Sequence, residues 1–204
     1  NGLAGRVEPL PALAIVPLGT ANVLAHELGL GFSASAVARA ITSGRELSMR
    51  PGAVDGPGPG GKRVRRYFLL MAGVGFDANV VAGVNPSLKR RWGRGAYVWR
   101  ALVEAWRYRD VRYAVEIDGA THHAASIIVT RARLYAGRYV VAPNASLGEP
   151  LLHVCLFERW GRMHTLRFGA ALLLDRLPRT TGYRVVRGQD VRVFALPDDD
   201  EDGH

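Results

Sequence analysis

The first 45 residues combine a short apolar run with helical spacing of apolar positions, a pattern typical of an α/β unit. The run Ala14–Val16 predicts a buried strand, which Pro17 stops before a tight turn at Gly19 and Thr20. Apolar residues three and four positions apart then predict two helices, over residues 22–28 and 35–43, each followed by a glycine.

After residue 45 the pattern changes to short extended segments with turn signals between them. A glycine- and proline-rich loop at 54–61 indicates a hairpin-type connection, and residues 111–118 alternate up to the Asp118-Gly119 turn. Further strands are predicted at 66–74, 124–131, 137–142, 151–157 and 190–195, and helices at 95–107 and 164–174. We therefore expect an α+β chain, with an α/β part over 1–45 and an antiparallel β-sandwich with inserted helices over 46–204.

The most informative feature of the composition is an excess of basic over acidic residues. The 204 residues carry 27 lysines and arginines against 18 acidic residues, a formal charge of +9, which favours nucleotide phosphates, an acidic membrane leaflet or nucleic acid as partners. The single cysteine, Cys155, excludes an intrachain disulfide framework and lies in an apolar segment, where we expect a buried, unreactive thiol. The longest uncharged stretch, residues 9–25, is interrupted by prolines and does not predict a regular membrane-spanning helix.

The turn at residues 17–22 carries the clearest chemical signal. A strand, a glycine turn and a helix start place free backbone N–H groups and a small hydroxyl where a phosphate can bind. Gly19 would let the backbone approach a nucleotide, and Thr20 and Asn22 offer hydrogen-bonding groups. The alternative is an ordinary strand-turn-helix connection with no ligand.

The full string P-x-G-T-x-N-x-x-A resembles a nucleotide-binding motif of the diacylglycerol kinase and sphingosine kinase catalytic family, especially its bacterial YegS-like lipid kinases. Three further segments match that family in order and spacing: Phe68–Ala78, Tyr135–Gly137, and Ala142–Ala145 followed by Leu151. The resemblance implies the end of a nucleotide-binding α/β domain followed by a β-sandwich. It also implies transfer of the γ-phosphoryl group of ATP, with Mg²⁺, to a lipid hydroxyl.

The same resemblance suggests roles for two residues beyond the turn. Asp77 follows two glycines on an apolar strand, and it is either a carboxylate that anchors a loop or one that faces substrate or cation. Arg90, in the basic run 89–94, matches an arginine that contacts nucleotide phosphates in sphingosine kinases. The alternatives for this run are contact with anionic lipid headgroups, with Trp92 in the interface, and a solvated basic face.

Some family positions differ here. In some bacterial members the loop matching 146–151 holds a structural Mg²⁺ through one carboxylate and two carbonyls, which implies Glu149, Ser146 and Leu151 as ligands. However, the usual Asp-Gly is Glu149-Pro150 in this chain. Two acidic positions of several bacterial members are Val23 and Arg50 here, so the Mg²⁺ network built on those acids is expected to be altered.

The family's G-G-D-G-T motif is absent from these residues, and its catalytic base belongs to a D-G-E motif near the C-terminus. Asp202-Gly203 is a formal match, but an acidic run replaces the apolar strand before it, so the base is either Asp202 or a residue beyond 204. We therefore expect a fragment of a lipid kinase that is inactive by itself.

The sequence thus predicts a diacylglycerol kinase-like enzyme that uses ATP and Mg²⁺, acts in the cytoplasm and binds peripherally to the inner membrane face. No nucleic acid partner is expected, and a homodimer is an open option. A sphingoid base is the alternative acceptor. A non-catalytic basic module that binds lipid or nucleic acid is the alternative of a different class.

Overall fold

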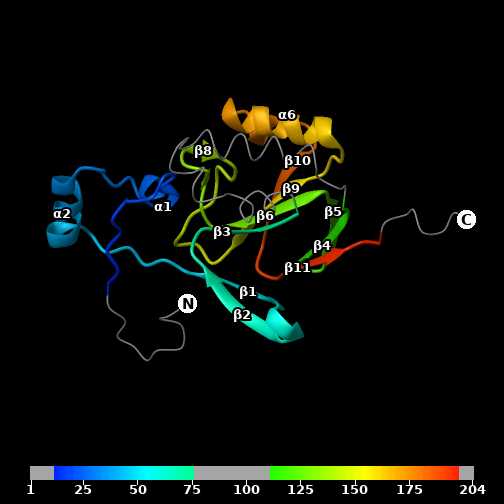
Figure 1. Ribbon diagram of the computed structural model, residues 1–204, viewed down its shortest axis with the longest axis horizontal. Helices are drawn as coiled ribbons and strands as arrows, with labels where there is room; N and C mark the ends of the chain where they lie inside the picture. Colours follow the sequence, from blue (N-terminus) through cyan, green and yellow to red (C-terminus); the bar gives the residue numbers. More distant parts are fainter. Residues whose placement is uncertain (1–11, 76–110, 198–204) are drawn as a thin grey trace, which may run out of the picture.

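The computed structural model describes residues 12–75 and 111–197, and the α+β architecture predicted from the sequence is confirmed (Figure 1). Its helices are α1 (Val23–Glu27), α2 (Ala34–Ser43) and α6 (Arg162–Leu173), with 3-10 turns η1 (Pro59–Gly61) and η2 (Leu177–Arg179). Its strands are β1 (Gly52–Pro57), β2 (Arg63–Phe68), β3 (Met71–Val74), β4 (Tyr113–Ile117), β5 (Ala120–Ala124), β6 (Ser126–Thr130), β7 (Leu134–Tyr135), β8 (Tyr139–Val140), β9 (Leu152–Phe157), β10 (Tyr183–Gly188) and β11 (Val191–Ala195).

Two antiparallel sheets form the centre of the molecule. One has the order β10-β9-β6-β3 and the other β11-β4-β5, and alternate residues of both build an apolar layer between them. The layer consists of Val115, Ile117, Ala124, Ile127, Val129, Val154 and Leu156. Because period-two alternation points one side chain in two to this layer, the sandwich follows from the sequence pattern.

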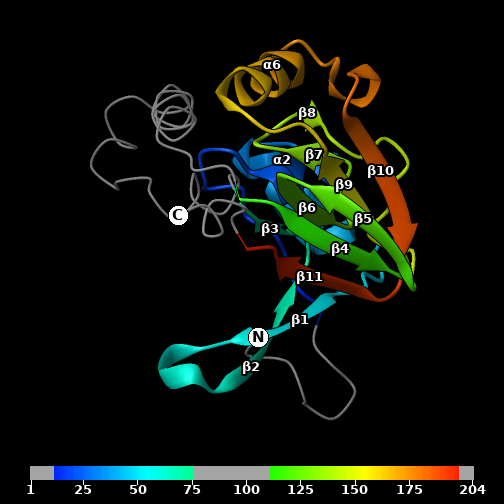
Figure 2. The same cartoon turned by 90° about the vertical axis from the view of Figure 1, so that its right-hand side faces the viewer.

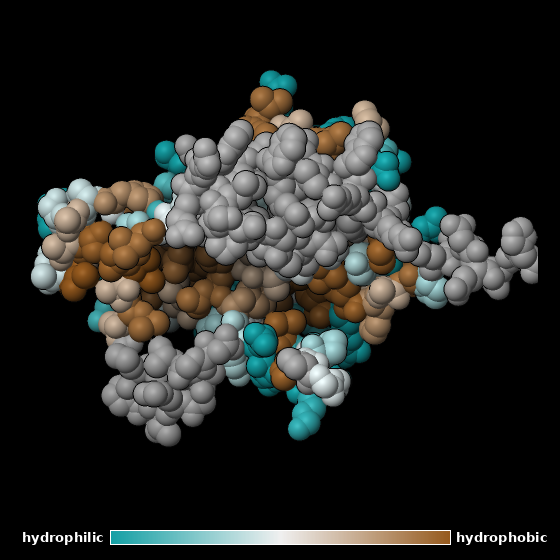
Figure 3. Space-filling view, viewed as in Figure 1, coloured by the Kyte–Doolittle hydropathy of each residue, from teal (hydrophilic) through white to brown (hydrophobic). Residues whose placement is uncertain are grey.

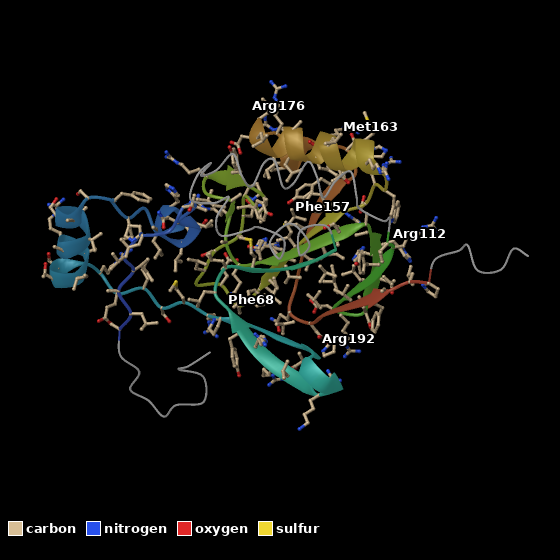
Figure 4. The ribbon with its side chains drawn as sticks, viewed as in Figure 1. Phe68, Arg112, Phe157, Met163, Arg176 and Arg192 are labelled. Atoms are coloured by element: carbon tan, nitrogen blue, oxygen red, sulfur yellow. The ribbon has the colours of Figure 1, made fainter. Side chains whose placement is uncertain are left out.

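The four-stranded sheet is covered on its other face by α6 and the loop after β8 (Figure 2). Phe157 of β9 lies beneath α6, with its ring centroid 5.3 Å from that of Phe168 and 5.0 Å from that of Tyr183 (Figure 4). The Tyr183 hydroxyl donates to the Val141 carbonyl at 2.7 Å, which ties the loop to the sheet. This second layer also contains Cys155 and Ile128.

The N-terminal part differs from the prediction in one respect. Residues 12–18 are irregular, so the predicted strand at Ala14–Val16 is wrong. A strand needs a hydrogen-bonded neighbour, and none of the described strands pairs with this segment, which leaves Val16 52% and Leu18 89% exposed. Apolar side chains gather on this side of the molecule, around α1 and α2 (Figure 3). Those exposed by more than a third include Leu13, Val16, Leu18, Phe32, Ile41 and Leu47.

Several predicted strands need new boundaries. The single strand at 66–74 is wrong, because a bend at residues 69–70 takes the chain from β2, paired with β1, into β3, paired with β6. A bend at Ala125 divides 124–131, and only residues 139–140 of 137–142 are extended. Strand β10 was not predicted at all. The helix predicted at 95–107 lies outside the described residues.

The β1–β2 hairpin projects from the sandwich on the side away from α6 in both views (Figures 1 and 2). Its glycine- and proline-rich tip turns through η1, where Gly60 and Gly61 have φ of 70° and 74°. One bidentate ion pair crosses it, from the Arg65 guanidinium to the Asp55 carboxylate at 2.8 and 2.6 Å. The glycine-rich hairpin predicted from residues 54–61 is therefore confirmed.

Candidate functional site

The turn before α1 is held by the side chain of Asn22. Its Oδ1 accepts from the Gly19 N–H at 2.8 Å, and its Nδ2 donates to the carbonyls of Gly19 at 2.6 Å and Pro17 at 3.3 Å. Asn22 itself adopts a left-handed backbone with φ of 44° and makes no side-chain cap bond to α1. The amide thus shapes the turn, which is a use that the sequence did not indicate.

Gly19 and Thr20 take different places in this turn. A Cβ at Gly19 would lie 3.0 Å from Asn22 Oδ1, so the close approach of the amide favours glycine. Thr20 is exposed, and its hydroxyl makes no hydrogen bond to the described residues. The turn therefore presents a free hydroxyl to solvent.

Glu27 fixes the turn against the sandwich. Its carboxylate, 5% exposed, accepts from the Leu134 N–H and from Arg133 Nε, each at 3.0 Å. These bonds join the end of α1 to β7, more than one hundred residues further along the chain. Sequence reasoning missed Glu27, because its partners are distant in sequence and no local pattern marks it.

The same contact brings two sequence motifs together. A Cβ at Gly137 would lie 3.6 Å from the Ala21 carbonyl, so the 136–138 turn between β7 and β8 runs beside the turn at 17–22. Ala136 and Gly137 both have positive φ, 49° and 117°. Residues 19–22 and 136–137 thus form one surface, which we call the double-turn site.

The loop at 146–151 does not fit the metal site that the family resemblance implies. The Glu149 carbonyl accepts from the guanidinium of Arg131, a residue only 3% exposed, and the Glu149 carboxylate faces His153 at 3.8 Å. The Leu147 carbonyl accepts from the Arg50 N–H at 3.1 Å. A guanidinium bound in the loop is unfavourable for a divalent cation nearby, and a metal ion at Glu149, Ser146 and Leu151 stays a prediction.

The remaining predicted residues are placed as follows. Asp77, Arg90 and Asp202 lie outside the described residues. Val23 opens α1, so this position adds no carboxylate to the double-turn site. Within residues 12–75 and 111–197, no group of three or more histidine, cysteine or acidic side chains is arranged to hold a metal ion.

The Cys155 thiol is buried in the layer beneath α6. Burial raises its pKa to about 12, so the thiolate needed for nucleophilic chemistry does not form near neutral pH. Burial, and then the neighbouring Cys155, also raises the pKa of Tyr183. These two groups are part of the core, as the sequence indicated for the cysteine.

No helix in the part of the chain that the structure describes is both long and apolar enough to cross a bilayer.

Comparisons with known proteins identify the family to which this fold belongs. Residues 1–54 match the diacylglycerol kinase catalytic domain, and residues 71–201 match the YegS C-terminal NAD kinase beta sandwich-like domain. The chain therefore belongs to the YegS-like lipid kinase family, as its motifs suggested.

Curated relatives carry the same name. The probable lipid kinase YegS-like of Pseudomonas putida is 31% identical over 85% of this chain and 58% of its own length. The corresponding protein of Chromohalobacter salexigens is 28% identical over 78% of this chain and 49% of its own length. The chain thus spans about half of the length of the curated relatives that it matches.

Solved structures share the fold at low identity. A diacylglycerol kinase structure from Bacillus anthracis covers 94% of this chain with 60% of its own length, at 19% identity and a TM-score of 0.58. A second structure from that organism covers 94% of this chain with 61% of its own, at 17% identity and a TM-score of 0.67.

Proposed function

We propose that the protein containing this chain is an ATP-dependent lipid kinase that transfers the γ-phosphoryl group to a lipid hydroxyl. The observation that carries the proposal is the double-turn site, where the P-x-G-T-x-N turn lies against the 136–137 turn of the sandwich. The match of residues 1–54 to a diacylglycerol kinase catalytic domain supports the same activity.

Phosphoryl transfer depends on positioning and on neutralising charge, because the transition state makes few new bonds to the protein. In our proposal Asn22 holds the turn open, Gly19 lets the nucleotide approach the backbone, and the free Thr20 hydroxyl donates to a phosphate oxygen. Mg²⁺ bound with ATP would supply positive charge that offsets the charge of the phosphates. Glu27 keeps this turn at a fixed distance from the sandwich.

We further propose a division of the chain near residue 45, with the end of the nucleotide-binding domain before it and the β-sandwich after it. The two family matches, which end at 54 and start at 71, support a division of the chain into two such parts. Arg90 is proposed to contact nucleotide phosphates, and Asp77 to face substrate or cation. The catalytic base is proposed to be either Asp202 or a residue beyond 204.

The lipid acceptor places the enzyme at a membrane, and we propose that the β1–β2 hairpin faces it. Lys62, Arg63 and Arg66 of this projecting hairpin make no ion pair with the described residues, whereas Asp55 is already used by Arg65. Cations near an anionic leaflet each contribute about 1 kcal/mol to binding. This supports a cytoplasmic protein bound peripherally at the inner membrane face.

Label transfer tests the proposal. The full-length protein would be incubated with γ-labelled ATP, Mg²⁺ and mixed micelles that contain diacylglycerol, a sphingoid base or neither. We expect label in the lipid fraction when diacylglycerol is present. Label found only with the sphingoid base would support lipid kinase activity but identify the sphingoid base as the acceptor. Thr20→Ala should raise the KM for ATP, whereas Thr42→Ala, an exposed threonine on α2, should not. Absence of label with every acceptor would contradict the proposal.

A further inference from the structure

A small cavity opens at the end of the four-stranded sheet, on the face that α6 covers. It has a volume of about 200 Å³ and is lined by Pro143, Asn144, His153, Val185 and Arg187. His153 of β9 is the direct cross-strand partner of Arg187 on β10 and of Thr130 on β6. Three polar residues thus replace the apolar row that Ile128, Cys155 and Val185 form next to them.

One buried polar group at this cavity has no hydrogen-bond partner among the described residues. The His153 side chain is 1% exposed, yet its Nε2 makes no hydrogen bond among the described residues. The nearest carboxylate, that of Glu149, lies 3.8 Å from this nitrogen, beyond hydrogen-bond distance. The Thr130 hydroxyl already has partners for both of its roles: it donates to the Leu70 or Ala132 carbonyl, and it accepts from the Ala132 N–H.

A second buried donor is close by. Arg131 follows β6, is 3% exposed, and its Nε has no partner among the described residues. A buried polar atom without a partner costs stability, so the His153 nitrogen that lines this cavity points to a ligand that bonds with it.

The charge around the cavity is positive. Burial is the main cause that lowers the pKa of the His153 imidazole; the charge of Glu149 opposes it, and the charges of Arg187 and Arg131 add to it. Arg50 acts in the same way on the pKa of Arg131. Among the described residues, Glu149 is the acidic group that acts on His153, and its carboxylate is 46% exposed. Basic groups therefore outnumber acidic ones among the described residues that act on this cluster.

We propose that this cavity binds a phosphoryl group, as free phosphate or as the headgroup of an anionic lipid. The Arg187 guanidinium and the Asn144 amide donate from the open rim, and His153 Nε2–H donates from the buried wall. The volume holds a tetrahedral anion together with a few waters, each of which occupies roughly 30 Å³ in the liquid. Charged, planar guanidinium donors suit phosphate oxygens better than a neutral ligand. The proposal does not depend on kinase activity.

The first test is calorimetric titration of the 204-residue chain with inorganic phosphate at constant ionic strength. We expect saturable binding that Arg187→Gln weakens about tenfold, the effect of losing one charged donor. The matched control is Arg176→Gln, which removes the same charge from a side chain that points away from the sheet (Figure 4). Equal binding by both variants, or no saturable binding by the unmodified chain, would overturn the proposal.

A second measurement needs no variant. Imidazole NMR signals of the unmodified chain would be followed during the phosphate titration. The His153 signal should shift and saturate, while that of His164, on α6 and away from the cavity lining, should stay in place. A His153 signal that does not respond would overturn the proposal.

Vesicle binding then identifies the source of the phosphoryl group. Vesicles of phosphatidylcholine with and without phosphatidic acid would be compared, with and without free phosphate. If phosphatidic acid increases binding, and free phosphate or Arg187→Gln removes the increase, the ligand is a lipid headgroup. If phosphate binds to the chain and Arg187→Gln leaves vesicle binding unchanged, the ligand is a free phosphate. Both results support the site.

Discussion

Glu27 is predicted to hold the turn at residues 17–22 on the sandwich, and its removal should release that turn without unfolding the core. Glu27→Ala removes a charge-assisted bond from the Leu134 N–H, for which about 1.5–3 kcal/mol is typical. The pair with Arg133, whose side chain is 50% exposed, is screened by solvent and contributes at most about 1 kcal/mol. The docking of α1 should therefore weaken by about 2–3 kcal/mol.

Hydrogen exchange measures this local release directly. The amides of His26 and Leu28, which donate to the Asn22 and Leu24 carbonyls, report on α1. Because 1.4 kcal/mol is a factor of ten, their exchange should speed up by about 30- to 150-fold, up to the rate of an unprotected chain. Amides of β6, in the centre of its sheet, should not change.

Two variants make the test specific. Glu27→Gln keeps an oxygen for the Leu134 N–H but loses the charge, so its effect should be intermediate. Glu46→Ala removes an exposed carboxylate that has no partner among the described residues and should leave α1 unchanged. If Glu27→Ala speeds exchange no more than Glu46→Ala does, the argument that Glu27 fixes the turn is refuted.

Three further predictions follow from other parts of the molecule. Replacing Arg63 and Arg66 of the hairpin by glutamine should weaken cosedimentation with phosphatidylglycerol vesicles and flatten its salt dependence; equal sedimentation by the variant would count against the hairpin as the membrane-facing element. Burial lowers the pKa of His153 below its ordinary value of 6.5, so the unfolded chain takes up the proton first, and the free energy of unfolding should fall as pH drops below about 6.5. In urea titrations at several pH values, His153→Gln should reduce the dependence of the unfolding free energy on pH. His123→Gln, on the exposed side of β5, should leave that dependence unchanged. An equal pH dependence in both variants would argue against the buried imidazole. Cys155 should react with a thiol reagent only after denaturant is added, and rapid reaction in the folded chain would contradict its burial.

The sandwich was largely predictable because its strands carry the period-two pattern that burial between two sheets imposes. Strand β9, expected at 151–157, runs over Leu152–Phe157, and the Asp118-Gly119 turn closes the β4–β5 hairpin as expected. Helix α6 similarly follows from the apolar spacing at 164–174. In each case the signal is local, so one segment of sequence is enough.

The failures are features that depend on distant partners. The apolar run at Ala14–Val16 needs a neighbouring strand that the described residues do not supply. Strand β10 escaped prediction because arginines flank its two valines, and pairing with β9 decides its conformation.

Within the candidate site the turn was predictable and its partners were not. The string at 17–22 predicts a turn that could bind phosphate, but the structure shows that the Asn22 amide forms its hydrogen bonds within that turn. Glu27 and Arg131 both act across long sequence separations, and neither carries a local signature. In particular, no one-dimensional pattern could show that a buried guanidinium lies in the loop expected to hold a metal.

The central claim, that this chain belongs to an enzyme that phosphorylates a lipid hydroxyl, is tested most directly by one measurement. The full-length protein would be given γ-labelled ATP, Mg²⁺ and diacylglycerol in mixed micelles, and the label extracted into the organic phase would be counted over time. The account predicts a linear increase in lipid-bound label that Thr20→Ala slows at low ATP and that saturating ATP restores. Lipid-bound label that never exceeds the protein-free control, in a preparation that binds the same micelles, would contradict it.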